Sequence, residues 1–101
     1  MLITLELKVE KMTYARVVNL EYRSAEDLEI YFEKWKNWAP DNMPQALSRT
    51  SVRTSADSTL LMAIYESEEI AEKAREMANM FFKMEAEHVR EIIDFHGPVI
   101  E

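Results

Sequence analysis

Two histidines are the residues of this chain best suited to acid–base chemistry, because imidazole gains and loses a proton near neutral pH. His88 follows apolar residues at helical spacing, so we expect it on the inner face of a helix, as a general acid or base. A hydrogen-bonded histidine of the core is the other interpretation. His96 could join it in a metal site with a carboxylate such as Glu91. Because 19 acidic residues make such coincidences common, we predict no metal site.

Aromatic side chains form a second group of candidates. Trp35 and Trp38, with two further aromatic residues, recur at helical spacing within 25–38. They could line a cavity for a flat apolar ligand, or they could fill an ordinary core. Trp38 precedes Pro40 at the expected helix end, so it would lie nearer to the mouth of a pocket.

Four more candidates lie on the expected strands and on the long helix. Tyr65 ends an apolar strand and could present its phenol to a pocket, and Asn19 lies on an earlier strand. Arg49 could bind a substrate carboxylate, or it could pair with acidic side chains of the sheet. Met84 lies on the same helical stripe as His88 and would form part of an apolar wall.

The composition excludes several classes of protein. A length of 101 residues suits one domain, expected to span 1–101. A net charge of −7 argues against nucleic acid or a membrane surface as partner. The absence of cysteine excludes disulfides and thiolate chemistry, and a single glycine, Gly97, excludes a glycine-rich phosphate loop. With neither a signal-peptide pattern nor a long apolar run, a cytoplasmic location is the default expectation.

The first half of the chain predicts two strands and a helix. Alternating apolar and polar residues indicate a strand over 2–9, and β-branched and aromatic residues indicate another over 13–22. Ser24 is an N-cap for an amphipathic helix over 25–38. Because proline breaks helices, we expect a loop from Pro40 onward.

The second half predicts a hairpin, a long helix and a short strand. The hairpin joins strands 46–54 and 59–65, and Ser67 is the N-cap of a helix over about 67–93. Because that length is large for so small a domain, we expect the helix either to bend or to end before Ile92. A last strand would lie near Pro98. The resulting order predicts an α+β, ferredoxin-like βαββαβ fold with one antiparallel sheet and both helices on one face. Residues 1–10 would add an extra N-terminal strand.

The segment LLMAIYESEEIAEKA (60–74) resembles the central strand and following helix of antibiotic-biosynthesis-monooxygenase-like proteins of the dimeric α/β-barrel superfamily. The topology is similar over about 13–101, although strand 2–9 and the glycine-free Met43-Pro44-Gln45-Ala46 depart from the usual pattern. The resemblance implies a homodimer joined sheet to sheet. Strand 59–65 independently needs a cover, because it is apolar on both sides, and a two-fold dimer supplies one.

The haem-degrading branch of that superfamily has a tryptophan and a histidine on the second helix, with an asparagine on the first strand. Asn19 could match the asparagine, but helix 67–93 has no tryptophan and Met84 stands near the expected histidine, which argues against haem.

The resemblance implies a homodimeric protein that binds or transforms a small apolar or aromatic molecule in a helix–sheet pocket. The implied activity is cofactor-independent monooxygenation. We expect His88 and Tyr65 as catalytic residues, and as ligand contacts Asn19, Trp35, Trp38, Met84 and Arg49. The alternative is a non-catalytic structural or interaction dimer with a filled core.

Overall fold

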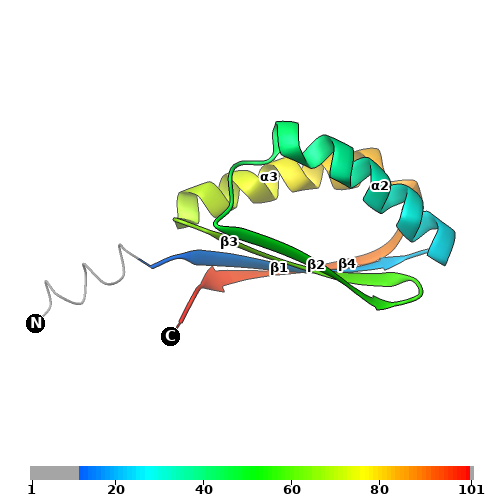
Figure 1. Cartoon of the computed structure of the whole chain (residues 1–101), viewed down its shortest axis with the longest axis horizontal. Helices are drawn as coiled ribbons and strands as arrows, with labels where there is room; N and C mark the ends of the chain where they lie inside the picture. Colours follow the sequence, from blue (N-terminus) through cyan, green and yellow to red (C-terminus); the bar gives the residue numbers. More distant parts are fainter. Residues whose placement is uncertain (1–11, 101) are drawn as a thin grey trace, which may run out of the picture.

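A computed structural model describes residues 12–100, which form one antiparallel sheet with two helices packed on one of its faces (Figure 1). The order along the chain is β1 (Tyr14–Tyr22), α2 (Ala25–Asn42), β2 (Ser48–Ser55), β3 (Ser58–Tyr65), α3 (Glu68–Met84), the 3₁₀ turn η1 (Ala86–His88) and β4 (Val89–Pro98). The strands lie in the order β2-β3-β1-β4. The expected βαββαβ fold is therefore confirmed, whereas the expected strand 2–9 lies outside the described residues.

Helix α2 begins where the sequence predicts and ends later. The Oγ of Ser24 accepts a hydrogen bond from the Asp27 N–H at 3.0 Å, as expected of an N-cap. The expectation that the helix stops before Pro40 was wrong, since it runs to Asn42. Proline offers no N–H to the carbonyl one turn earlier, on Lys36. Both residues are exposed, so that carbonyl can face water and the helix can continue for two more residues.

Helix α3 is shorter than the sequence predicts, and β4 is longer. Ser67 caps the helix, with its Oγ accepting from the Ile70 N–H at 3.2 Å. The expected helix over 67–93 ends at Met84, and His88 therefore lies in η1 instead of on a helical stripe. The apolar residues of VREII (89–93) fit both the helical and the strand period. Antiparallel pairing with β1 makes this segment a strand.

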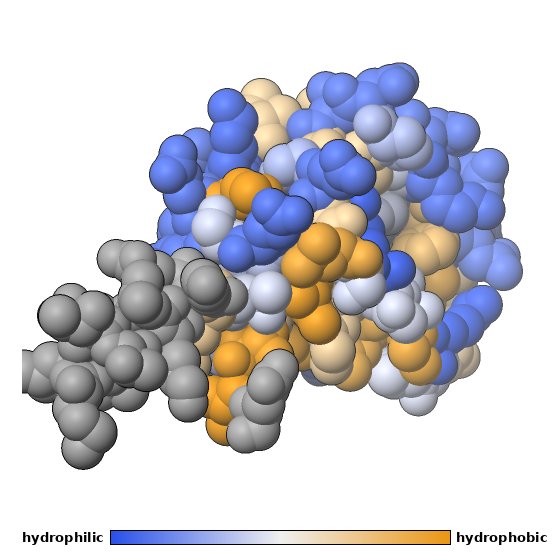
Figure 2. Space-filling view, turned by 60° about the vertical axis from the view of Figure 1, so that its left-hand side comes forward, coloured by the Kyte–Doolittle hydropathy of each residue, from blue (hydrophilic) through white to orange (hydrophobic). Residues whose placement is uncertain are grey.

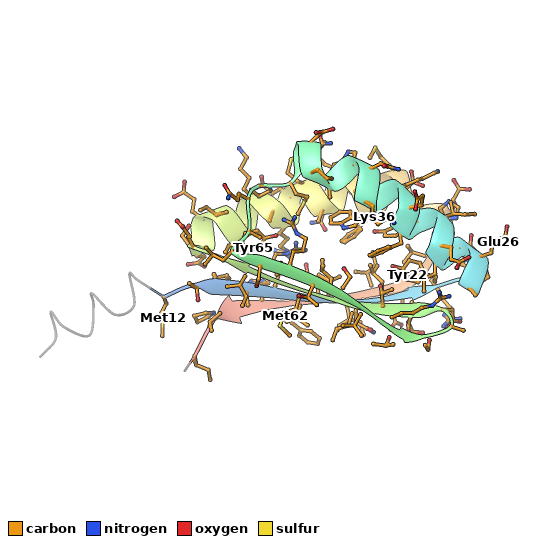
Figure 3. The ribbon with its side chains drawn as sticks, in the orientation of Figure 1. Met12, Tyr22, Glu26, Lys36, Met62 and Tyr65 are labelled. Atoms are coloured by element: carbon orange, nitrogen blue, oxygen red, sulfur yellow. The ribbon has the colours of Figure 1, made fainter. Side chains whose placement is uncertain are left out.

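Side chains of the sheet alternate between a covered face under the helices and an open face. In Figure 3, Tyr22 lies on the side of the helices, whereas Met62 points away from them. The expectation that β3 is apolar on both sides is confirmed: Leu61 and Ala63 are buried under the helices, and the open face carries Leu60, Met62 and Ile64.

The outer surface of the helical layer is largely hydrophilic, and hydrophobic surface gathers below it, toward the sheet (Figure 2). Neither helix in the part of the chain that the structure describes is long and apolar enough to cross a membrane. Strand β2 is exposed over its whole length, since α2 and α3 pack on the other strands. A space is left between α2 and β2.

Candidate functional site

A pocket opens between α2 and strands β2 and β3. Its outer part is a groove of about 450 Å³, and its inner part is a cavity of about 20 Å³ under α2. Phe32, Ser51 and Thr59 line both parts, so the cavity and the groove are neighbouring compartments of one site. The inner cavity has room for one water-sized group, which needs about 10–15 Å³.

The small residues of β2 keep this pocket open. Ser51 pairs with Leu61 on β3 and lies on the covered face, where a larger side chain would reach toward Phe32 on α2. Because no helix covers β2, the groove beside it stays open to solvent.

Aromatic rings form the inner wall. Tyr31 packs edge-to-face against Tyr22 and Phe81, with ring centroids 5.3 and 5.1 Å apart, and its ring lies 6.4 Å from that of Phe82. Trp35 packs against Phe81 at 5.2 Å. Packing of large rings from a strand and two helices fixes the shape of the cavity before any ligand arrives.

Two of the side chains that line the inner cavity, Tyr22 and Tyr31, carry buried phenol groups. The Tyr22 hydroxyl is hydrogen-bonded to Oγ1 of Thr59 at 2.8 Å, and both side chains are buried. The Tyr31 hydroxyl is also buried but has no partner among residues 12–100. Burial raises the pKa of both phenols, and the nearby Tyr22 and Glu85 raise the pKa of Tyr31 further. Both phenols therefore stay neutral and can donate a hydrogen bond.

Charged side chains surround the mouth of the groove. Glu29 on α2 and Arg53 on β2 approach to 3.7 Å, and Glu33 lies beside them. The Glu29 and Arg53 side chains are 70% and 46% exposed, so this ion pair contributes little to stability. The two side chains can therefore move apart when a ligand enters.

Of the seven predicted site residues, Trp35 alone lies in the wall of the inner cavity. Trp38 packs behind it, with ring centroids 5.7 Å from Trp35 and 5.0 Å from Phe81. Tyr65 and Arg49 lie together elsewhere on the covered face, where Arg49 Nη2 donates to the Tyr65 hydroxyl at 3.5 Å.

The other three predicted residues lie apart from the pocket lining. Asn19 lies on the open face of β1, between Leu60 and Ile93 of the neighbouring strands. Met84 is 56% exposed at the end of α3, so the expected apolar contact with His88 on one helical stripe was wrong. His88 itself is buried in η1.

Sequence reasoning missed Tyr22, Ser51 and Thr59 as pocket residues. A usable signal existed for Tyr22, which follows Val18 and Leu20 in the alternation of β1 and so had to face the core. Thr59 is likewise in phase with the buried side chains of β3. Nothing local marks Ser51, whose contribution is its small size.

His88 holds the beginning of α2 against η1. Its Nδ1 donates to Oδ1 of Asp27 at 2.7 Å, and its carbonyl accepts from the Arg23 N–H at 3.1 Å. Further along α2, Lys34 pairs with Glu85 at 2.9 Å. These contacts set the position of the helix that forms one side of the pocket.

His96 and His88 lie apart: His88 is buried in η1, and His96 lies on β4. It is exposed on β4, with Nδ1 3.3 Å from the Tyr14 hydroxyl. Within residues 12–100, no three His, Asp or Glu side chains gather closely enough to hold a metal ion.

Asp27→Asn should destabilise the protein at neutral pH, and the difference from wild type should shrink in acid. The hydrogen bond from His88, and then that from Ser24, lower the pKa of Asp27 below its ordinary value. A carboxyl with a lowered folded-state pKa stabilises the fold above its ordinary pKa of about 4 and loses that effect as pH falls through the lowered value. Urea denaturation at several pH values measures the difference.

The control is Asp41→Asn, since Asp41 is an exposed carboxyl near the other end of the same helix. The Asp41→Asn variant should have the same urea midpoint as wild type at every pH. An Asp27→Asn midpoint that stays below wild type by a constant amount down to pH 2 would contradict the assigned role of the carboxylate.

Comparison with known proteins gives structural neighbours only, since no protein-family model and no curated protein matches the chain. A dimeric ferredoxin-like protein from an uncultured marine organism is 13% identical, with a TM-score of 0.73 over 92% of each chain. The monooxygenase ActVA-Orf6 of Streptomyces coelicolor, in complex with nanaomycin D, is 12% identical, with a TM-score of 0.69 over 95% of each chain.

A Caulobacter crescentus protein provisionally named an antibiotic biosynthesis monooxygenase is 13% identical, with a TM-score of 0.69 over 97% of this chain and 99% of its own. At these identities the likeness concerns the fold. This chain therefore shares its fold with dimeric ferredoxin-like proteins and with antibiotic-biosynthesis-monooxygenase-like proteins.

Proposed function

We propose that this protein is a homodimer that binds or transforms a small apolar or aromatic molecule in the pocket between α2 and the sheet. The observation that carries the proposal is the pocket itself, in which an open groove of about 450 Å³ lies next to a cavity walled by aromatic rings. Small-molecule sites are typically concave and mostly apolar, with a few placed polar groups. In the outer groove, Ser51, Thr59 and the charged side chains at its mouth are such groups.

If the protein is an enzyme, the reaction that we propose for this site is monooxygenation without a cofactor. It is supported by the shared fold with a Streptomyces monooxygenase that was solved with a bound ligand. Without a cofactor, the substrate itself must supply the electrons that reduce dioxygen. His88 and Tyr65 lie outside the pocket lining, so we assign His88 to positioning α2 through Asp27.

A non-catalytic dimer with a filled core is the second candidate. The inner cavity favours this candidate, because aromatic side chains fill most of the space under α2. The remaining volume of about 20 Å³ has room for one water-sized group. The outer groove favours ligand binding, because it is large enough for a bicyclic ring.

The proposed dimer covers the open face of the sheet. Apolar side chains of all four strands lie there, and several are exposed: Val52 at 49%, Met62 at 45%, Ile93 at 38% and Phe95 at 62%. These side chains are neighbours across the sheet: Met62 on β3 and Phe95 on β4 each pair with Val17 of β1. An apolar patch of this kind favours association, and the dimeric neighbour supports a second copy as the cover.

Ser51→Phe should block the pocket. A phenyl ring placed between the groove and the inner cavity would fill the space beside Phe32. With 2-acetonaphthone as the probe, we expect the variant to bind at least about tenfold more weakly than wild type, the equivalent of losing one well-buried group. Quenching of tryptophan fluorescence reports binding, because Trp35 lines the cavity.

Glu76→Phe is the matched control, since it adds the same ring to an exposed position on α3 that lines neither compartment. It should bind the probe as wild type does. If Ser51→Phe also binds like wild type while remaining folded by circular dichroism, this pocket is not the binding site.

A further inference from the structure

Strand β2 forms a free edge of the sheet. Within residues 12–100 its one strand neighbour is β3, and its side chains are exposed from Ser48 to Ser55. The outer side of such a strand presents unpaired N–H and C=O groups at the spacing that a further strand requires. An extended segment can therefore add to this edge, with hydrogen bonds from its main chain.

The covered face of β2 carries charges in a fixed order. The side chains on this face are Arg49, Ser51 and Arg53. The Arg49 guanidinium donates to the Pro44 carbonyl at 3.1 Å, and no carboxylate within residues 12–100 pairs with it. Arg53 lies 3.7 Å from Glu29 in an exposed ion pair of little strength. Between the arginines, Ser51 borders the groove that Glu29 and Glu33 line. Two cations therefore flank a position close to two carboxylates.

The sequence ahead of the described residues has the complementary order of charges. Residues 3–10 alternate apolar and polar side chains, and the last three polar positions are Glu6, Lys8 and Glu10. In antiparallel pairing with β2, a register with Glu6 opposite Arg53 also brings Glu10 opposite Arg49. Lys8 then falls between the arginines, opposite Ser51. A shift of two residues in either direction would set Lys8 against an arginine, so the charges select this register.

The opposite side of the segment is apolar and matches the open face. Its side chains are Ile3, Leu5, Leu7 and Val9. In the same register Leu7 lies opposite Val52, which is 49% exposed on the open face. A shift of one residue would instead place all four apolar side chains on the covered face, beside the arginines. The segment therefore extends the apolar open face that the proposed homodimer covers.

The other edge strand, β4, matches the segment less well. Its side chains on the covered face include Ile92, Asp94 and His96. Lys8 could lie opposite Asp94, but this carboxylate already faces Arg16 at 3.6 Å and Arg75 at 3.7 Å. One of the two acids that flank Lys8 would then lie against the apolar Ile92. Only β2 offers a cation to each acid of the segment.

A chain cannot reach its own β2 in this register. With Glu10 opposite Arg49, residue 12 would lie beside Leu47 at the outer edge. Tyr14 on β1 lies three strand spacings further in, about 14 Å away, because β3 and β2 stand between. The chain from residue 12 to residue 14 spans at most about 7 Å. The segment that pairs with β2 must therefore belong to a second copy.

We propose that two copies of this chain exchange their N-terminal segments, with residues 3–10 of each copy added antiparallel to β2 of the other. Ion pairs of Glu6 with Arg53 and of Glu10 with Arg49 fix the register. Because the exchange is reciprocal, two-fold symmetry closes it at two copies. The inference rests on the homodimer proposed above, and it places a segment of the second copy at the edge of the groove.

An introduced disulfide tests the register directly, because the chain has no cysteine of its own. Lys8→Cys combined with Ser51→Cys should give covalent dimers on a denaturing, non-reducing gel after mild oxidation, since side chains directly opposite each other lie within disulfide range. Mass spectrometry of peptides should find positions 8 and 51 joined. Lys8→Cys combined with His96→Cys is the matched control, because His96 is exposed on the other edge strand. These two positions should stay unlinked.

Charge reversal tests the exchange without cross-linking. Glu6→Arg and Arg53→Glu should each raise the dimer dissociation constant about tenfold, because two ion pairs become two contacts between like charges. An equimolar mixture of the two variants should recover the wild-type constant, since each copy then meets the opposite charge on the other. Glu76→Arg, at an exposed position of α3, should leave the constant unchanged. Sedimentation velocity measures each constant.

The outcomes distinguish this inference from the proposed function. If wild type is dimeric but positions 8 and 51 stay unlinked, or link within one chain, the exchange is wrong and the homodimer stands. A mixture of the charge variants that dissociates as readily as each variant alone also overturns the exchange. Linking of position 8 to position 96 would move the segment to β4 and overturn the register. A wild type that is monomeric at micromolar concentration overturns both the exchange and the proposed homodimer.

Discussion

Phe81→Ala should lower the free energy of unfolding by about 3–5 kcal/mol, the usual cost of deleting a buried phenyl ring. Phe81 is 2% exposed, and its ring centroid lies 5.0–5.2 Å from those of Tyr31, Trp35 and Trp38. The cavity left behind would border three large rings that cannot collapse into it. Because domains of this size are stable by about 5–15 kcal/mol, this substitution removes a large share of the total. Urea denaturation followed by circular dichroism measures the loss.

Met80→Ala is the matched control, since Met80 precedes Phe81 on α3 and is 56% exposed. A surface substitution of this kind changes stability by about 0.5 kcal/mol or less. Equal losses in the two variants would contradict the structure's assignment of which face of α3 is buried. Because Phe81 supports Tyr31 and Trp35, the Phe81→Ala variant should also bind 2-acetonaphthone more weakly.

Most of the fold could be predicted from the sequence, because local signals and burial agree along most of it. Ser24 and Ser67 mark the helix starts, and both side chains cap as expected. β-branched and aromatic residues predict β1, and an apolar run predicts β3, each to within one residue of its observed bounds. The end of α3 could not be predicted this way, because Val89, Ile92 and Ile93 satisfy both the helical and the strand period. Hydrogen bonding to β1, which joins residues far apart in sequence, decides between the two.

The candidate site was predictable only in part. Trp35 could be placed in a helix–sheet pocket from its helical spacing, and the structure puts it in the cavity wall. The Tyr22–Thr59 hydrogen bond joins residues 37 positions apart, and no local pattern encodes such a pairing. The expected role of His88 depended on a helix that ends before it, and the residue instead bonds Asp27 at the start of α2.

The burial of Arg16 also lay beyond sequence reasoning. Its side chain is fully buried on the covered face, 3.6 Å from Asp94 on β4, although a charged residue on a strand normally indicates an exposed position. Arg75 on α3 approaches the same carboxylate at 3.7 Å. The three side chains link the sheet to α3 away from the pocket residues.

Met62→Lys should convert the proposed homodimer into a folded monomer. In one chain Met62 is 45% exposed on the open face, so a lysine there can reach water without disturbing the core. In a two-fold dimer joined through that face, the same substitution places a charge in each copy at an apolar interface. An unpaired buried charge costs about 3–5 kcal/mol, so the dimer should dissociate about a hundredfold more readily, or more. Native mass spectrometry and sedimentation velocity measure the change.

Met80→Lys is the control, because it introduces the same charge at an exposed methionine on α3, away from the open face. It should remain dimeric. A wild-type protein that is monomeric at micromolar concentration, or a Met62→Lys variant that dimerises as wild type does, would exclude the open face as the interface. The proposed pocket is built from α2, β2 and β3 of a single chain, so on this proposal a monomeric Met62→Lys variant should still bind 2-acetonaphthone. Loss of binding in that folded monomer would instead mean that the second copy completes the groove beside Val52, which lies at the edge of both surfaces.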